Sequence, residues 1–133
     1  AFQTNCMQCH GAGGAGSPGF PNLVDDDWIW GGSLEQIYTT IRHGIRNTDD
    51  KSRQSMMPRF GADGLLTGSQ VAAVTDYVLS LSGRAKATPE GAKIWQEQCV
   101  ACHGADGKGN QELGAPNLAD GLWLYGGGRD AIY

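Results

Sequence analysis

Apolar residues recur at helical spacing in three segments of the chain, and each segment begins with a pattern that starts helices. Residues 33–44 and 67–83 each open with a capping box, Ser-x-x-Gln or Thr-x-x-Gln, and each closes on a glycine. Residues 88–99 open with Thr-Pro, a cap followed by the residue favoured at the first helical position. The apolar faces consist of Leu34, Ile37 and Ile41, then of Val71, Val74, Val78 and Leu81, and finally of Ile94 and Trp95.

The stretches between these segments are long and rich in glycine. None of them alternates apolar and polar residues as a half-buried strand does. The chain has 21 glycines among 133 residues, about twice the share of an average protein. The pattern therefore predicts an all-α fold with long loops.

The chain also repeats itself, because short strings recur in the same order at a nearly constant separation. The separation changes only in a glycine-rich loop, where an insertion costs little. The matching stretches are 6–12 with 99–105, 19–23 with 114–118, 28–32 with 123–127, and 37–38 with 132–133. The repeat predicts a first domain over 1–83, a linker over 84–88 and a second domain over 89–133 that is incomplete at its C-terminal end.

All four cysteines of the chain lie in one pair of repeated strings, 6–12 and 99–105, and both of these begin with Cys-x-x-Cys-His. This string is typical of covalent haem c attachment. Two thiols at this spacing form thioethers with the two vinyl groups of one haem, and the next residue offers an imidazole to the iron. We therefore expect two haem c groups, bound through Cys6, Cys9 and His10 in the first unit and through Cys99, Cys102 and His103 in the second.

Other uses of paired cysteines fit the sequence less well. One zinc held by both pairs would need a much shorter separation than that between Cys9 and Cys99. A thioredoxin-like pair would need a βαβ pattern. Two disulfides would leave the adjoining histidines unexplained. A structural zinc or disulfide protein without haem is the remaining alternative.

A haem with a proximal histidine has a second axial position, and methionine there raises the reduction potential. Met57, followed by proline, stands far enough after His10 for the intervening loop to pass around the haem. Met56 is the neighbouring alternative, and His43 would give a bis-histidine haem. Met7 lies inside the attachment string and cannot reach the far face of the haem.

Charge and hydropathy narrow the function further. The net charge is −4 and the pI about 5.2, so the chain lacks the basic face that nucleic-acid binding requires. No apolar run approaches the roughly 18 residues of a membrane span, and no secretory signal precedes the first cysteine. Half of the ten basic residues gather in one short stretch, where one or two could pair with haem propionates: Arg42, Arg46, Lys51, Arg53 and Arg59.

Beyond the attachment strings, the chain resembles the dihaem c-type subunit of the cbb₃-type haem–copper cytochrome oxidases over nearly its whole length. The specific part of the resemblance is the order of the tryptophan–glycine, proline–asparagine–leucine and methionine–proline strings. They lie at 19–23, 27–32, 40–44, 57–61 and 77–83 in the first unit, and at 102–104, 107–110, 114–118 and 123–127 in the second. The resemblance implies two tandem class I cytochrome c-like haem domains, the second truncated.

The resemblance also implies roles for particular residues. The carbonyls of Pro21 and Pro116 would accept the Nδ1–H of the proximal histidines, which fixes the tautomer of each imidazole. Met57 would be the sixth ligand of the first haem. Leucine side chains would line the haem faces and tryptophans would form a dry wall: Leu23 and Leu118, and Trp28, Trp30 and Trp123 with Tyr125.

The function implied is electron transfer to the oxygen-reducing subunit on the periplasmic side of a bacterial inner membrane, with no catalysis by this chain alone. The expected partners are the other oxidase subunits and a cytochrome c or quinol-linked donor, with no nucleic acid. The family subunit carries an N-terminal membrane helix that this sequence lacks, so we expect membrane association only through that missing anchor or through the complex. A free-standing soluble dihaem shuttle is the alternative, and a dihaem peroxidase or a gas sensor is a more distant one.

Overall fold

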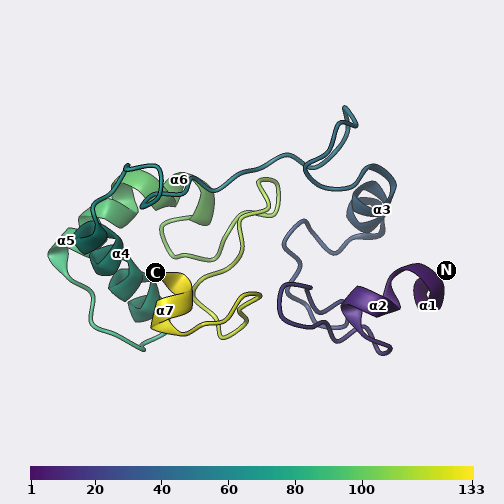
Figure 1. Ribbon diagram of the computed structural model, residues 1–133, viewed down its shortest axis with the longest axis horizontal. Coiled ribbons are helices and arrows are strands. Elements are labelled where there is room, and N and C mark those ends of the chain that lie inside the picture. Colours follow the sequence, from purple (N-terminus) through teal and green to yellow (C-terminus); the bar gives the residue numbers. More distant parts are fainter.

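The structure is a computed structural model of residues 1–133, and its regular elements are all helical (Figure 1). Strand-like pairing is confined to three isolated bridges. The helices are α1 (Phe2–Asn5), α2 (Met7–His10), α3 (Leu34–His43), α4 (Gly68–Leu81), α5 (Pro89–Ile94), the π-helix η1 (Trp95–Cys99), α6 (Val100–His103) and α7 (Arg129–Ile132). The all-α prediction is confirmed.

The predicted helix starts form as the capping patterns require. In α3, the Ser33 hydroxyl accepts from the Gln36 amide at 3.2 Å, and the Gln36 side chain accepts from the Ser33 amide at 3.0 Å. The same reciprocal box opens α4 through Thr67 and Gln70. At α5, the Thr88 hydroxyl caps a helix whose first residue is proline. Each box satisfies backbone donors that a helix N-terminus otherwise leaves unpaired.

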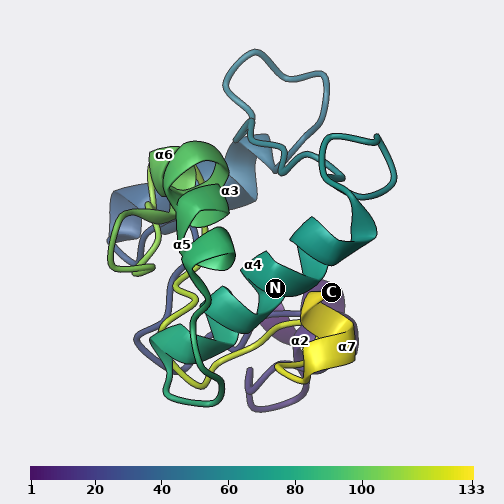
Figure 2. The ribbon, with the colours of Figure 1, turned by 90° about the vertical axis from the view of Figure 1, so that its left-hand side faces the viewer.

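The helices form two lobes (Figure 1). The first lobe holds α1, α2 and α3, and the second holds α4 to α7, with the segment between α3 and α4 joining them. Figure 2 shows α5 and α7 on either side of α4, and α4 contacts both helices. The sequence assigned the helix over 67–83 to the first unit, whereas in the structure it packs in the second lobe.

The crossing of α4 and α5 explains this packing. Gly91 lies so close to the backbone of α4 that a Cβ atom there would overlap the Ala73 carbonyl oxygen. One turn further along, the rings of Tyr77 and Trp95 lie 5.4 Å apart. Trp95 is fully buried, so the second unit supplies both the close approach and the large apolar surface that the apolar face of α4 needs. The core consists of Trp30, Val78, Leu79, Ile94, Trp95 and Ala115.

The protein core is small for a chain of this length. Only 13 of 133 residues are buried, and the chain exposes 8706 Å². A compact protein of 14.1 kDa exposes about 6,700 Å². The exposed surface includes the apolar face of α3, where Leu34 is 86% and Ile41 80% exposed. The polypeptide therefore leaves apolar surface that its own side chains do not cover.

Candidate haem c sites

Both Cys-x-x-Cys-His strings end in a short helix, α2 or α6, followed by a loop that returns to the histidine. In the first unit, His10 Nδ1–H donates to the Pro21 carbonyl oxygen at 2.9 Å. In the second, His103 Nδ1–H donates to the Pro116 carbonyl oxygen at 3.1 Å. A carbonyl only accepts, so this bond places the proton on Nδ1 and leaves Nε2 as the free donor atom of each ring.

The backbone of the two loops is held by the same set of hydrogen bonds. The glycine amide that follows each histidine by a few residues donates to the histidine carbonyl, and the leucine after each Pro-Asn pair donates back to a glycine carbonyl. The pairs are Gly16 to His10 at 2.8 Å, Gly109 to His103 at 2.9 Å, Leu23 to Gly14 at 2.8 Å and Leu118 to Gly107 at 2.7 Å. These bonds fix the backbone of Leu23 and Leu118, both half-buried, within the two loops.

The cysteines occupy equivalent positions in the two units. Cys9 and Cys102 are exposed, whereas Cys6 and Cys99 are half-buried, and all four thiols are free. Burial, with a smaller contribution from Cys102, raises the pKa of the Cys99 thiol. No group of three His, Cys, Asp or Glu side chains converges as a zinc site requires. The geometry thus presents two separate dithiol–imidazole sets.

The surroundings of the two histidines differ. His103 is only 7% exposed, and the ring of Trp95 lies 6.2 Å from it. His10 is half-exposed, and the nearest aromatic ring is that of Phe20 at 6.1 Å, edge on. The sequence patterns gave no separate role to Phe20 or to Tyr77, which packs on Trp95. The signal for Phe20 was its place in the string before Pro21.

The tryptophans after the loops pack in the same way in both units. Trp28 lies on Gly32 and Trp123 on Gly127, and a Cβ atom at either glycine would come within 2.6 Å of the indole. The indole nitrogen of Trp123 is buried without a hydrogen-bond partner. The guanidinium of Arg84 lies 5.2 Å from the same ring. The Trp-x-x-Gly-Gly strings therefore form turns that hold an indole against the backbone.

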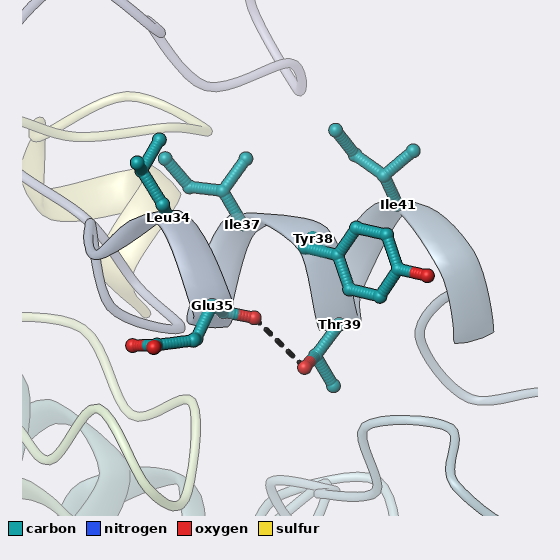
Figure 3. Close-up of a pocket in the computed structure, with 6 residues that line it drawn as sticks. All are labelled: Leu34, Glu35, Ile37, Tyr38, Thr39 and Ile41. Carbon is teal, nitrogen blue, oxygen red and sulfur yellow. Dashed lines mark hydrogen bonds between the residues drawn. The ribbon is translucent and has the colours of Figure 1, made fainter.

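An open hollow follows the apolar face of α3 in the first lobe. Figure 3 shows Leu34, Ile37 and Ile41 projecting from one side of the helix, with Tyr38 beside them and Glu35 on the other side. On the polar side of the helix, the hydroxyl of Thr39 donates to the Glu35 carbonyl at 2.8 Å. The face is wide, apolar and without a protein partner, as a surface that covers an apolar group would be.

The candidate axial ligands lie outside both loops. Met56 is 85% and Met57 67% exposed. They belong to the segment between α3 and α4, which runs along the upper edge of the molecule in Figures 1 and 2, away from α2. The structure does not bring Met57 to His10. His43 instead pairs with Asp49, Nδ1 to Oδ2 at 3.0 Å, and that bond lowers the pKa of the Asp49 carboxyl.

The residues present fit covalently bound haem c. Each unit offers two thiols and an imidazole with a free Nε2, and the first lobe also has the uncovered apolar face of α3. Three buried side-chain donors have no hydrogen-bond partner, Arg53 Nε, Trp95 Nε1 and Trp123 Nε1, and the propionates of a haem are acceptors of the kind that such donors lack. The chain therefore has the attachment, ligation and polar groups that the cofactor requires.

Comparison with known proteins agrees with this assignment. The cytochrome c family profile matches twice, over residues 1–82 and 89–133. The chain belongs to the cytochrome c family, and its two units correspond to two covalently bound haem c groups that serve electron transfer.

More specifically, the chain is similar to dihaem subunits of cbb₃-type oxidases. It is 58% identical over 135 residues to the Cbb3-type cytochrome c oxidase subunit CcoP of Cereibacter sphaeroides, covering 98% of this chain and 47% of that protein. It is 54% identical over 136 residues to subunit FixP of Azorhizobium caulinodans, covering 99% and 46%. The resemblance inferred from the sequence is confirmed. The chain spans about 47% of the length of the first of these relatives.

No helix in the structure combines the length and the apolar character that crossing a membrane requires.

Proposed function

We propose that this chain carries electrons between a donor and the oxygen-reducing subunit of a cbb₃-type oxidase, through two haem c groups and without catalysing a reaction by itself. The observation that carries the proposal is the paired geometry of the attachment loops, in which each proximal histidine donates to a proline carbonyl. The similarity to CcoP and FixP subunits supports the particular oxidase.

The chain's own residues hold and tune the cofactor. Cys6 and Cys9 would anchor the first haem and Cys99 and Cys102 the second, with His10 and His103 as proximal ligands. The proline carbonyls keep the proton on Nδ1, so that Nε2 would be free to bind the iron and the imidazole would be a stronger donor. When bound, haem c supplies one-electron exchange between its ferric and ferrous states. Trp28, Trp30 and Trp123 would exclude water around it.

The sixth ligand of the first haem is the sulfur of Met57 in this proposal. A soft thioether favours ferrous iron and raises the potential. The exposure of Met57 and the length of the segment between α3 and α4 leave its side chain free to close over the open face of the first unit. The Asp49 contact is made by Nδ1 of His43 and leaves its Nε2 free, so the preference for methionine over the bis-histidine alternative rests on the methionine–proline string of the family.

The two haem-binding sequences are divided in this proposal as 1–83 and 89–133, joined by 84–88. The other oxidase subunits are the expected partners, and a cytochrome c or a quinol-linked protein is the expected donor. These partners place the haem units on the periplasmic side of a bacterial inner membrane.

The test begins with protein matured in a bacterial periplasm, with haem counted per chain from the alkaline pyridine spectrum. We expect two covalent haems, one after the double substitution Cys6→Ser and Cys9→Ser in the first unit, and two after the control His43→Ala. A wild-type chain without covalent haem would refute the proposal. Co-purification with a membrane oxidase separates the oxidase subunit from a free-standing shuttle.

The axial ligand is tested by a matched pair of variants. Met57→Ala should abolish the sulfur-to-iron charge-transfer band of the ferric protein, while Met56→Ala should keep it. The opposite result would assign the role to Met56, and loss of the band in neither variant would exclude both.

A further inference from the structure

The two lobes touch through residues that are equivalent in the repeat. Gly19 in the first unit corresponds to Gly114 in the second, since both precede the Pro-Asn-Leu string by two residues. Trp30 corresponds to Tyr125 in the Trp-x-x-Gly-Gly strings. Figure 1 shows the loops that carry these residues meeting between the lobes.

The contact is reciprocal. Trp30 of the first unit lies on Gly114 of the second, so closely that a Cβ atom at Gly114 would overlap the indole. Tyr125 of the second unit lies on Gly19 of the first, where a Cβ atom would stand 3.5 Å from Tyr125 Cε1. Beside it, the Gly19 amide donates to the Leu124 carbonyl at 2.8 Å. Each aromatic residue thus packs on a glycine of the opposite unit, and the two glycines occupy equivalent positions in the repeat.

We infer that the two haem units dock on one another through a self-complementary surface, formed by Gly19, Trp30, Gly114 and Tyr125. A patch that pairs with its own equivalent is what a two-fold relation between like units produces. The two halves are unequal, because Trp30 is 9% and Tyr125 78% exposed. The half that holds Trp30 on Gly114 therefore provides most of the buried area.

This docking surface also sets the relative position of the two proximal histidines. Gly19 and Gly114 each stand two residues before the proline whose carbonyl accepts from the proximal histidine. Docking through these glycines holds the two loops, and both imidazoles, in one arrangement. A fixed arrangement of the imidazoles would also fix the distance over which one electron passes between two haems, with no bond made or broken. This consequence rests on the proposed function.

The test uses the full chain with its haems and follows hydrogen exchange at the Gly19 amide, in the unit opposite the altered residue. Gly114→Ala should speed that exchange at least about tenfold by displacing Trp30. Gly64→Ala is the matched control, because Gly64 also has a positive φ, 69° against 60° at Gly114, and has nothing within 4 Å of a Cβ atom. It should leave the Gly19 amide unchanged.

A second pair of variants covers the case in which Gly114→Ala does not fold. Tyr125→Ala removes an exposed side chain and should speed exchange at Gly19 a few-fold. Tyr38→Ala, at another exposed tyrosine on α3 (58% against 78%), should not. Unchanged exchange at Gly19 in a folded Gly114→Ala or Tyr125→Ala protein would overturn the inference, as would an unprotected Gly19 amide in the unaltered protein. None of these outcomes depends on binding to an oxidase.

Discussion

The two attachment loops share their backbone geometry but not their surroundings. Each histidine donates to a proline carbonyl at about the same distance, 2.9 Å in the first unit and 3.1 Å in the second. Yet His103 is 7% exposed beneath Trp95, whereas His10 is half-exposed beside the edge of Phe20. The comparison separates what a short string determines locally from what requires a distant segment of chain.

The distant segment is α4, which contacts α5 and α7 in the second lobe and leaves α3 uncovered. Gly91 admits the α4 backbone, and Trp95 fills the space beside Tyr77. The residues before Cys6 form only the short helix α1 and offer no comparable surface to α4. Burial of large apolar side chains, rather than position in the sequence, therefore decides which loop is covered.

The largest expected effect comes from the aromatic residue nearest each histidine. Trp95→Ala should lower the free energy of unfolding of the second lobe by about 3–5 kcal/mol, because it removes a fully buried indole. Phe20→Ala, at a residue 44% exposed, should cost about 1 kcal/mol in the first lobe. Hydrogen exchange, followed amide by amide in the haem-bound protein, measures each lobe separately.

Equal losses in the two variants would contradict the comparison, since they would mean that both histidines are covered alike. A loss spread over both lobes in Trp95→Ala would show instead that the lobes unfold as one unit.

The next largest effect tests whether α4 packs on α5 in solution. Gly91→Ala should cost about 1–3 kcal/mol, because its Cβ would overlap the Ala73 carbonyl oxygen and force the helices apart. Gly121→Ala in the same lobe is the control, since nothing lies within 4 Å of a Cβ there. Thermal unfolding of the two variants should differ clearly. A Gly91→Ala protein as stable as the control would mean that α4 packs elsewhere in solution.

These local features were largely predictable from the sequence. Capping boxes at Ser33 and Thr67 identified where α3 and α4 begin, because the chemistry that starts a helix lies within four residues. The loops after the two histidines were predictable for the same reason, since their glycines and the Pro-Asn-Leu string fix a short stretch of backbone. The histidine–proline bonds were expected from the family resemblance and are present.

The partner of α4 was not predictable from periodicity. An apolar face at helical spacing shows that a helix packs on something, but it does not say on which unit, and here the close approach at Gly91 decides. Met57 shows a similar limit. The sequence can name it as a ligand, yet its placement depends on a long segment that the haem itself would order.

A smaller effect concerns the ion pair that joins α7 to α4. Arg129 Nε lies 2.8 Å from Asp76 Oδ1, and this bond raises the pKa of the guanidinium. Asp76→Asn should lower the unfolding temperature slightly at low salt and not at all in concentrated salt, which screens exposed pairs. The control is Asp63→Asn, which breaks a pair with Arg59 inside one segment. If Asp63→Asn had the larger effect, the pair would not hold α7 on α4.

The smallest expected effect lies in the first lobe, where Asp27 faces the second. Burial, then Asp120 and Asp25, raises the pKa of the Asp27 carboxyl. A carboxyl whose pKa is higher in the folded state opposes folding once it ionises, so the protein loses stability as the pH rises through that pKa. Asp27→Asn should therefore stabilise the protein at pH 7, by about 0.5 kcal/mol or less because solvent screens the group.

In urea unfolding the gain should vanish below about pH 3, where the carboxyl is protonated in both states. Asp26→Asn, at an exposed neighbour, should leave stability unchanged. A destabilised Asp27→Asn protein at neutral pH would show instead that the ionised carboxylate favours the contact between the lobes.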